Sequence, residues 1–179
     1  MKIAIGSDTS GLPLKEALKT YLDSRQIPYE DFSISGEEVS QYPHVAERVS
    51  KAVLSGRAER GILVCGNGAG MCIAANKFPG IRAVLCSEPY TAITSRRYNN
   101  TNVLCLGARV VGSGLASMIL EGWLSAAFDG QANQAQLDSI TRIEQRNAPP
   151  AALPPAPLVP PDQELTRKLE DTRPTRAQD

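Results

Sequence analysis

The sequence has few of the residues that usually indicate a metal site or a charged partner. It holds one histidine, His44, and equal numbers of acidic and basic residues, 19 of each. Because one imidazole and no clustered carboxylates make a poor ligand set, we expect no metal site. Zero net charge likewise favours neither nucleic acid nor an anionic membrane as a partner. A membrane-spanning helix needs about 20 apolar residues, and no apolar run in this chain is that long, so we expect no membrane anchor. The chain starts on a strand-like segment, so we also expect no signal peptide.

The cysteines also lack the spacing of a metal or redox motif. There are four of them, and no two form a Cys-x-x-Cys pair; they are Cys65, Cys72, Cys86 and Cys105. All lie in or beside apolar segments, so we expect reduced thiols in a cytoplasmic protein.

The most informative stretch runs from Gly61 to Lys77. Its apolar run from Ile62 to Val64 predicts a strand buried on both faces, and Cys65 stands at the end of that strand. The next segment is rich in glycine, which lets the backbone turn sharply and approach a ligand, and the helix expected after it favours negative charge near its first N–H groups. The glycines are Gly66, Gly68 and Gly70. The stretch therefore predicts a nucleophile or base beside an anion-binding turn.

Two other interpretations of this stretch remain open. A cysteine at the end of a buried strand is often only a small core residue. A glycine-rich turn between a strand and a helix often binds a nucleotide, but no Gly-Lys-Ser/Thr ending is present, which excludes a P-loop. The third glycine of a dinucleotide fingerprint falls on Met71, and Cys86 stands near its acidic position, although Glu88 is close. A nucleotide-binding module is kept as an alternative.

Strand-like and helix-like segments alternate five times along the chain. This alternation predicts an α/β fold, a three-layer αβα sandwich with a five-stranded, parallel, doubly wound, Rossmann-like sheet. The expected strands are 2–7, 29–34, 62–64, 81–86 and 103–106, and the expected helices are 14–22, 45–53, 70–78, 90–98, 115–128 and 133–146.

Polar groups follow three of these strands, namely Asp8, Cys65 and Ser87. We expect them at one edge of the sheet, for which the polar loop 99–102 is a further candidate. Asp8 is either a helix cap or a ligand-facing carboxylate. The helix 115–128 is apolar almost all round, so it needs two partners, the sheet and, as one option, a second subunit. Arg96 and Arg97 are expected on a solvated helix face.

The composition changes near residue 148. Residues 1–147 are expected to form one domain. Residues 148–161 are rich in proline and residues 162–179 are charged with few apolar side chains. We expect 148–179 to be a tail, extended and then disordered or weakly helical, with a docking segment as the alternative.

Several motifs together carry a family resemblance. They are Gly6-Ser7-Asp8, Tyr42-Pro43-His44, Cys65-Gly66-x-Gly68-x-Gly70, Ala74-Ala75-Asn76-Lys77, Gly80-Ile81-Arg82-Ala83 and Asn102-Val103-Leu104-x-Leu106-Gly107-x-Arg109-Val110. Over residues 1–147 the chain resembles the type B ribose-5-phosphate isomerases, a family that includes the galactose-6-phosphate isomerase subunits.

The resemblance implies an enzyme that interconverts an aldose and a ketose through a cis-enediolate, with no metal or cofactor, in carbohydrate metabolism of the pentose phosphate type. It implies a homodimer or a dimer of dimers. The family's proton-transferring cysteine maps onto Cys65, and its backbone donors to the enediolate oxygen map onto the three glycines of the turn. Its sugar-binding aspartate maps onto Asp8 and its asparagine onto Asn99.

The chain departs from the family pattern at the phosphate grip and at the ring-opening group. Thr9 and Tyr98 stand where the family has histidines, and Asn67 stands where it has a threonine. Ala132 and Gln136 replace two phosphate-binding arginines, with Arg109, Arg142 and Arg146 as possible substitutes. The predicted catalytic residues are Cys65, Asn67 and Tyr98, and the predicted substrate-binding residues are Asp8, Thr9, Tyr42, Gly66, Gly68, Gly70, Asn99 and Arg109.

These departures bear on the substrate. Two lost hydrogen bonds to a charged group remove about 3–6 kcal/mol of phosphate binding. We therefore expect an unphosphorylated or differently anionic sugar, or a short sugar that does not close a ring. A non-catalytic sugar-binding or regulatory protein on the same fold is the alternative, and it would bind a sugar without turnover.

Overall fold

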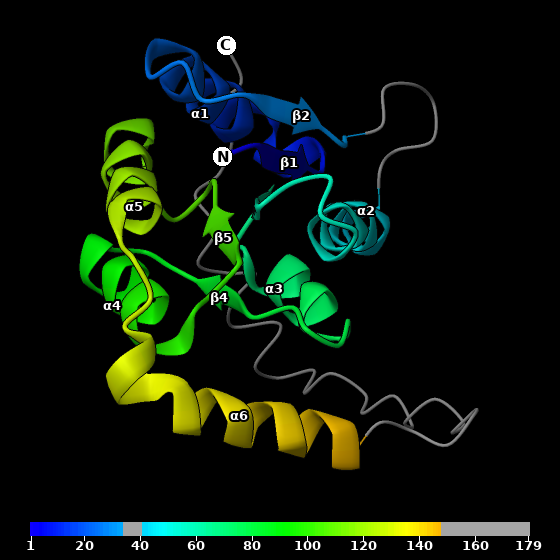
Figure 1. The fold of residues 1–179 in the computed structure, drawn as a ribbon. Helices are drawn as coiled ribbons and strands as arrows, with labels where there is room; N and C mark the ends of the chain where they lie inside the picture. The colour runs from blue at the N-terminus through cyan, green and yellow to red at the C-terminus, as the bar shows by residue number, and fades with distance from the viewer. Residues whose placement is uncertain (34–40, 148–179) are drawn as a thin grey trace, which may run out of the picture. The chain divides into compact units, whose positions relative to one another are not determined.

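The computed structural model describes residues 1–33 and 41–147, so the expected tail, 148–179, lies outside the described residues. Five parallel strands form one sheet in the order β2-β1-β3-β5-β4 (Figure 1). Their bounds are β1 Ile3–Ser7, β2 Tyr29–Asp31, β3 Arg60–Cys65, β4 Ala83–Leu85 and β5 Val103–Gly107.

The three central strands are apolar and almost wholly buried, whereas the edge strands β2 and β4 have only three residues each. Both faces of a central parallel strand lie under helices, which is why these strands are continuous apolar runs. In the register, Ile5 lies opposite Ile62, and Cys65 lies opposite Gly107. The carboxyl ends of β1, β3 and β5 therefore lie side by side along one edge of the sheet, the edge that runs across the ends of the strands.

Helices cover both faces of the sheet (Figure 1). The bounds are η1 Thr9–Gly11, α1 Leu12–Ser24, α2 Tyr42–Leu54, α3 Ala69–Ala75, α4 Pro89–Asn99, α5 Ser113–Ser125 and α6 Gly130–Arg146. Buried side chains of α1, α4 and α5 share one apolar cluster with the sheet, and those of α2 and α3 share the other. The predicted three-layer αβα sandwich with a parallel five-stranded sheet is confirmed.

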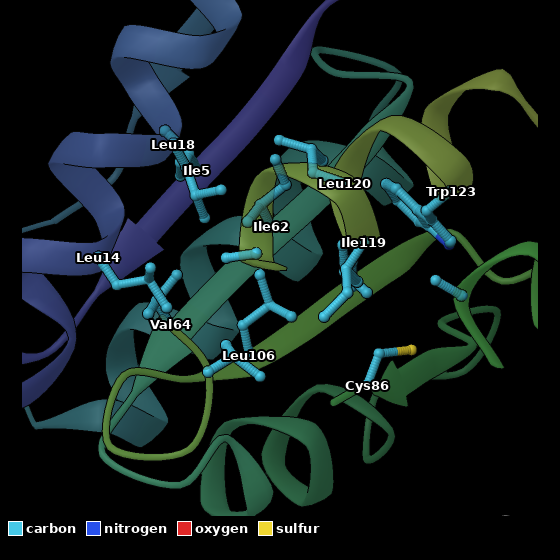
Figure 2. Close-up of a cluster of buried hydrophobic side chains, with 14 of the residues drawn as sticks. Ile5, Leu14, Leu18, Ile62, Val64, Cys86, Leu106, Ile119, Leu120 and Trp123 are labelled. Carbon is cyan, nitrogen blue, oxygen red and sulfur yellow. The ribbon is translucent and has the colours of Figure 1, made fainter. Parts of the chain in front are cut away.

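Figure 2 shows the cluster under α1 and α5. Leu14 and Leu18 of α1 meet Ile5 and Ile62 of the sheet, and Trp123 of α5 closes the cluster. Burying an aromatic side chain of this size stabilises a fold by several kcal/mol only if its polar atom is also bonded. The Trp123 Nε1–H meets that need by donating to Thr101 Oγ1 at 2.9 Å.

The segment between α3 and β4 differs from the expectation. We expected a helix to residue 78 and a strand from residue 81, but α3 ends at Ala75 and β4 starts at Ala83. The Asn76 side chain accepts from Ala83 N at 2.8 Å and donates to Ala83 O at 2.9 Å. Asn102 Oδ1 accepts from Arg82 N at 2.8 Å. Side-chain amides thus satisfy the backbone groups that a longer strand would have paired.

Arg96 is also not on a solvated face. It is half-buried and donates to the carbonyl oxygen of Thr101 at 2.8 Å. Burial, with the nearby charges of Arg60 and Arg82, lowers the pKa of Arg96 to about 10. Arg97, in contrast, is exposed as expected.

α5 and α6 each leave apolar side chains in solvent. Met118 of α5 is 60% exposed, and Ile140 and Ile143 of α6 are 45% and 53% exposed. The buried side chains of α5 pack against the sheet, which is one of the two partners expected for this helix.

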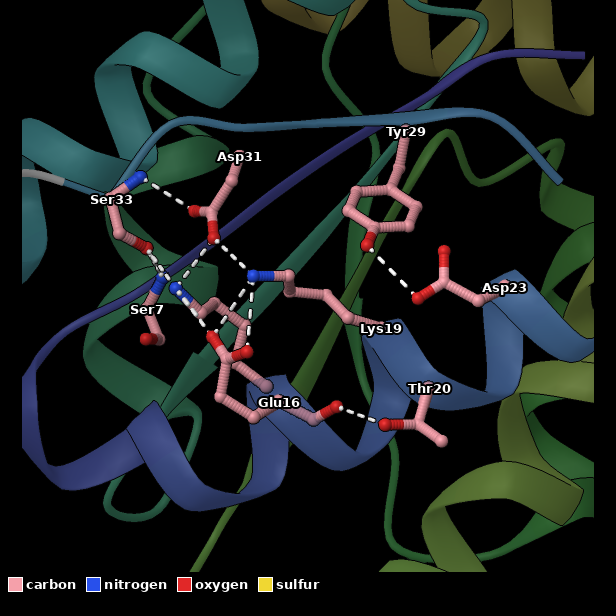
Figure 3. A network of polar contacts seen from close by, with 9 residues as sticks. Ser7, Glu16, Lys19, Thr20, Asp23, Tyr29, Asp31 and Ser33 are labelled. Atoms are coloured by element: carbon pink, nitrogen blue, oxygen red, sulfur yellow. Dashed lines mark hydrogen bonds and ion pairs between the residues drawn. The ribbon is translucent and has the colours of Figure 1, made fainter.

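A polar network ties α1 to the ends of β1 and β2 (Figure 3). The Lys15 side chain is only 4% exposed, and its Nζ lies 2.7 Å from Asp31 Oδ2 and 3.1 Å from Ser33 Oγ. Ser33 Oγ in turn accepts from Ser7 N at 3.0 Å, one residue before Asp8. A buried ammonium is costly unless it is paired, so this network fixes the end of β1.

We expect Asp31→Asn to lower the free energy of unfolding by about 2–3 kcal/mol, because it leaves the buried Lys15 ammonium with only the more distant and exposed Glu16 carboxylate, whose Oε1 lies 3.3 Å from Lys15 Nζ. Partial burial by itself would raise the pKa of Asp31, but hydrogen bonds from Lys15 and Ser33 outweigh it and hold that pKa below its ordinary value. The stabilisation is therefore complete above about pH 4 and is lost as the pH falls through the lowered pKa.

Urea unfolding of the variant at pH 7 measures this effect. The matched control is Glu47→Gln, because Glu47 forms a 2.6 Å ion pair with the exposed Lys51 and such pairs contribute below about 1 kcal/mol. If the two variants lose the same free energy of unfolding, the ion pair between Lys15 and Asp31 contributes no more to stability than an exposed pair, which would contradict this prediction.

Candidate active site

A cavity of about 400 Å³ opens at the edge where β1, β3 and β5 end. It lies next to the point where the order of strands reverses between β1 and β3, the usual ligand site of an open parallel sheet. Its lining consists of Asp8, Tyr42, Cys65, Gly66, Asn67, Gly70 and Arg109. All of these are among the site residues predicted from the sequence.

Cys65 is the last residue of β3 and is 5% exposed. Its Sγ accepts a hydrogen bond from Gly68 N at 3.1 Å, and its carbonyl oxygen accepts from Ala108 N at 2.8 Å. The strand thus fixes the backbone of Cys65 while the turn fixes its sulfur. A thiol held in this way at a cavity wall can exchange a proton with a bound molecule.

Gly68 has a left-handed backbone, with φ of +80°, which favours glycine. A Cβ at this position would lie 2.4 Å from Leu85 Cδ1 and 3.0 Å from the carbonyl carbon of Leu106. No side chain fits, and this conformation is the one that directs the Gly68 N–H to Cys65 Sγ. Glycine is therefore required here both for the turn and for the position of the sulfur.

Gly70 and Tyr42 form the adjoining wall. A Cβ on Gly70 would lie 2.8 Å from the Tyr42 ring, so the aromatic side chain packs directly on the glycine backbone. Gly70 is the second residue of α3, and its N–H is among the first four of the helix, which have no intrahelical acceptor. The wall thus places a backbone donor beside an aromatic ring.

Asp8 and Asn67 each use one oxygen for local structure. Asp8 Oδ1 accepts from Gly11 N at 2.9 Å and caps η1, and Asn67 Oδ1 accepts from Ala69 N at 3.0 Å. Both residues also line the cavity. Asp8 therefore acts as a helix cap and also lies where a ligand-facing carboxylate was expected, and its role towards a ligand stays a prediction. The groups left to meet a ligand are the second carboxylate oxygen of Asp8 and the amide Nδ2 donor of Asn67.

Arg109 supplies the positive charge at this cavity. Its backbone N donates to the carbonyl oxygen of Gly66 at 2.9 Å, which places the residue over the glycine turn. The side chain is exposed and lines the cavity. A guanidinium at the rim is suited to an anionic ligand, because it can donate two parallel hydrogen bonds to a carboxylate or phosphate.

Tyr98 and Asn99 do not reach this cavity within one chain. They end α4, and a helix that follows a parallel strand runs back to the opposite edge of the sheet. The loop that follows lies there too, since Asn102 O accepts from Gly61 N at the start of β3. The expectation that the loop 99–102 shares an edge with Cys65 is therefore wrong for a single chain.

Other residues considered from the sequence also lie away from the lining. Thr9 is exposed in η1, Ser87 is exposed after β4, and His44 is exposed on α2. Ala132 and Gln136 are exposed on α6. The exposed His44 has its Nδ1 4.0 Å from Glu47 Oε2 on the same helix.

Two glycines that support the site were not foreseen. A Cβ on Gly11 would lie 2.3 Å from Val64 O, and one on Gly107 would lie 2.7 Å from the Asn67 carbonyl carbon. Both let neighbouring backbones approach closely beneath the cavity. The signal was present, because Gly107 ends β5 and Gly11 lies in the turn after β1, both at the end of the sheet that carries the cavity.

No group of three or more histidine, cysteine, aspartate or glutamate side chains in residues 1–33 and 41–147 could hold a metal ion. Over the same residues, no helix has the length and apolar character that crossing a membrane requires.

Comparison with known proteins identifies the family to which this chain belongs. The model of the Ribose/Galactose Isomerase family matches residues 3–140. Ribose-5-phosphate isomerase B of Escherichia coli is 49% identical over 145 residues, which cover 81% of this chain and 97% of that protein. D-erythrulose-4-phosphate isomerase of Pectobacterium atrosepticum is 40% identical over 148 residues, covering 82% and 97%. The solved ribose-5-phosphate isomerase B of Clostridium thermocellum aligns with a TM-score of 0.79 and 44% identity, covering 83% of this chain and 100% of that one. The expectation of an isomerase is confirmed at the level of the family, and this chain belongs to the ribose/galactose isomerase family.

Proposed function

We propose that this protein interconverts an aldose and a ketose by moving a proton between C1 and C2 of a short, anionic sugar, with Cys65 as the base. The observation that carries the proposal is the Cys65 thiol, which a hydrogen bond from Gly68 N holds at the wall of a cavity that also presents Asp8 and Arg109. A binding protein would have little use for a thiol in that position.

The proposed step balances without a metal or a cofactor. The Cys65 thiolate removes the proton from C2 of the aldose, and the electron pair moves into a C1–C2 double bond as the aldehyde oxygen takes up negative charge. The Cys65 thiol then returns its proton to C1, while the hydroxyl proton on O2 moves to O1 and the ketone forms. Only protons are transferred, so general acid–base chemistry suffices.

The enediolate oxygen needs donors where its charge develops. The Gly68 N–H is directed at Cys65, so we assign this role to the Gly70 N–H and to Asn67 Nδ2, with the Gly66 backbone beside them. A donor placed where charge develops lowers a barrier by about 3–4 kcal/mol. Asp8 is proposed to hold the sugar hydroxyls.

The proposed substrate is a four-carbon sugar phosphate, because the site has an arginine for an anion but no ring-opening histidine. A four-carbon aldose phosphorylated on its terminal oxygen cannot close a five-membered ring, because the hydroxyl that would close it carries the phosphate. Such a sugar needs no ring-opening histidine, which agrees with Tyr98 at that position of the family pattern. The relative named D-erythrulose-4-phosphate isomerase, which is 40% identical to this chain, supports the proposal of a four-carbon substrate. We propose Arg109 as the anion-binding group, with a free sugar as the second possibility.

We further propose a homodimer, in the cytoplasm, in central carbohydrate metabolism. Tyr98 and Asn99 lie at the edge of the sheet opposite to Cys65 in their own chain. They would contribute to catalysis only by entering the cavity of a second copy, which is how a dimer would complete the site. The exposed apolar side chains of the α4–α5 side, among them Tyr90 and Met118, are suited to such a contact.

The test is isomer formation, followed by NMR, on erythrose 4-phosphate, ribose 5-phosphate and the corresponding free sugars. We expect kcat/KM for the four-carbon phosphate to exceed that for ribose 5-phosphate by about tenfold or more. Arg109→Gln should raise KM for the phosphates by about 10- to 100-fold, the loss of one charged hydrogen-bonding group, and leave KM for free sugars unchanged. Faster turnover of ribose 5-phosphate would contradict the substrate assignment, and binding without turnover of any sugar would favour the regulatory alternative.

A further inference from the structure

At the end of β1 a side chain takes over from the backbone of β2 as hydrogen-bond acceptor. The Phe32 N–H donates to the carbonyl oxygen of Ile5 at 2.7 Å, as in a regular ladder. Two residues further along β1, the Ser7 N–H donates to the hydroxyl oxygen of Ser33 at 3.0 Å, after β2 has ended (Figure 3). Ser7 directly precedes Asp8, which lines the cavity. This serine hydroxyl therefore holds the backbone that leads into the site.

The Ser33 hydroxyl is itself held in place by a buried ion pair. Lys15 Nζ donates to Ser33 Oγ at 3.1 Å, and Ser33 N donates to Asp31 Oδ1 at 3.0 Å. The same Lys15 ammonium pairs with Asp31 Oδ2 at 2.7 Å. A hydroxyl oxygen has two lone pairs, and the bonds from Lys15 and Ser7 occupy both. The ion pair thus orients the oxygen that holds the end of β1.

Asp8 lies between this anchor and the turn that it caps. The Gly11 N–H donates to Asp8 Oδ1 at 2.9 Å and to Asp8 O at 3.2 Å, so one carboxylate oxygen is committed to the turn. The direction of the other oxygen then depends on how the backbone of residues 7 and 8 is held. On the side of β3, Asp8 N donates to Val64 O at 3.3 Å. On the side of β2, the bond from Ser7 to Ser33 is the shorter of the two, at 3.0 Å.

We propose that Ser33 is a positioning residue for sugar binding, because its hydroxyl sets the Asp8 carboxylate through the backbone of Ser7. This inference rests on the proposed function, in which Asp8 binds the sugar hydroxyls and Cys65 moves the proton. Ser33 is not among the residues that line the cavity, so it acts on the sugar only through β1. Hydrogen bonds weaken steeply with poor geometry, so a displaced carboxylate binds the sugar less tightly.

Ser33→Ala is expected to raise KM for the sugar by about tenfold, the loss of one hydrogen bond to a charged group. The value of kcat should stay the same, because the proton is moved by Cys65 on β3, and weaker binding alone raises KM. Ser33→Thr keeps the hydroxyl and should restore the KM of the wild type. Steady-state assays on the full-length chain measure both constants. A fall in kcat with KM unchanged, or no rescue by threonine, would overturn the proposal.

A double-mutant cycle with Asp8 separates positioning from a general loss of stability. In the Asp8→Ala background the carboxylate is absent, so Ser33→Ala should raise KM further by less than about twofold. The same tenfold increase in both backgrounds would overturn the proposal, because Ser33 would then act without Asp8. Ile119→Val is the stability control, since it removes a buried methyl group from α5, which does not line the cavity. It should leave KM unchanged, and an increase like that of Ser33→Ala would point to instability instead.

Amide hydrogen exchange, followed by NMR on the full-length chain without a sugar, tests the positioning by itself. Gly11 reports on Asp8, because its N–H donates to two oxygens of that residue. In Ser33→Ala we expect the Ser7 amide to exchange about tenfold faster relative to amides of β3, and the Gly11 amide to exchange faster as well. Ile119→Val should speed exchange of all these amides alike. Faster exchange at Ser7 with Gly11 unchanged would show that Asp8 stays in place, and would overturn the proposal.

The proposed function and the positioning of Asp8 fail in different measurements. If the wild type converts no sugar, the proposed function is wrong, and the exchange rates still decide whether Ser33 holds Asp8. If the wild type converts a sugar and Ser33→Ala does so with the same KM, the proposed function stands and the positioning role is wrong.

Discussion

Cys65→Ala is expected to lower kcat for aldose–ketose conversion by about 10²–10⁴-fold, the contribution that a positioned acid–base group makes. The loss should appear in kcat more than in KM, because the proposed role of the sulfur is to move the proton, whereas the sugar hydroxyls are proposed to bind Asp8. Stopped assays with product quantified by NMR measure both constants. Because the side chain is small and lies at a cavity wall, the variant should fold as the wild type does.

Two further variants make this result specific. Cys65→Ser keeps an acceptor for the Gly68 N–H but replaces the thiol with a hydroxyl that ionises far less readily, so it should be nearly as impaired as Cys65→Ala. Cys86→Ala removes another buried cysteine and should leave kcat unchanged. Retained turnover in Cys65→Ala would exclude Cys65 as the base and leave the cavity without an assigned one.

Gly68→Ala is expected to reduce both stability and turnover. A left-handed backbone costs a non-glycine residue about 1–2 kcal/mol, and the overpacking against Leu85 and the Leu106 backbone adds about 1–3 kcal/mol. We expect the free energy of unfolding to fall by about 2–4 kcal/mol in urea. Turnover should fall as well, because relief of the 2.4 Å contact moves the N–H that holds Cys65 Sγ.

Gly56 provides the matched control, since its φ is +75° and a Cβ there would meet nothing within 4 Å. Gly56→Ala should therefore show the backbone cost alone, with normal turnover. Combining Gly68→Ala with Leu85→Ala removes the closest clash and should recover part of the turnover. If Gly56→Ala and Gly68→Ala are equally destabilised and equally active, the close packing behind the turn does not matter for the site.

The layers of the fold were predictable because apolar segments alternate with helical ones along the chain. Ile62 to Val64 form a buried strand as expected, and Cys65 and Asp8 lie at the carboxyl edge because strands of a parallel sheet all end there. The cavity lining was predictable for the same reason, since local turns after β1, β3 and β5 supply most of it. Tyr42 is the exception, as it comes from the start of α2 and its place depends on packing against Gly70.

Features that depend on contacts distant in sequence were not predictable. The amide of Asn76 ends α3 early only because Ala83 lies beside it. Lys15 looked like an ordinary charged helix residue, and only the fold shows it buried against Asp31. Arg96 is half-buried because the loop after α4 folds back under it. The position of Tyr98 and Asn99, in contrast, was predictable, because they end the helix that runs back from one parallel strand to the start of the next.

The most direct test of the central claim is isomerisation in deuterium oxide, with deuterium in the product located by NMR. Proton transfer through Cys65 predicts solvent deuterium at C1 of the ketose or at C2 of the aldose, because the thiol lies at the wall of a cavity open to solvent. It also predicts that Cys65→Ala slows deuterium incorporation by the same factor as isomer formation. Product without solvent deuterium, formed as fast by Cys65→Ala as by the wild type, would contradict the account.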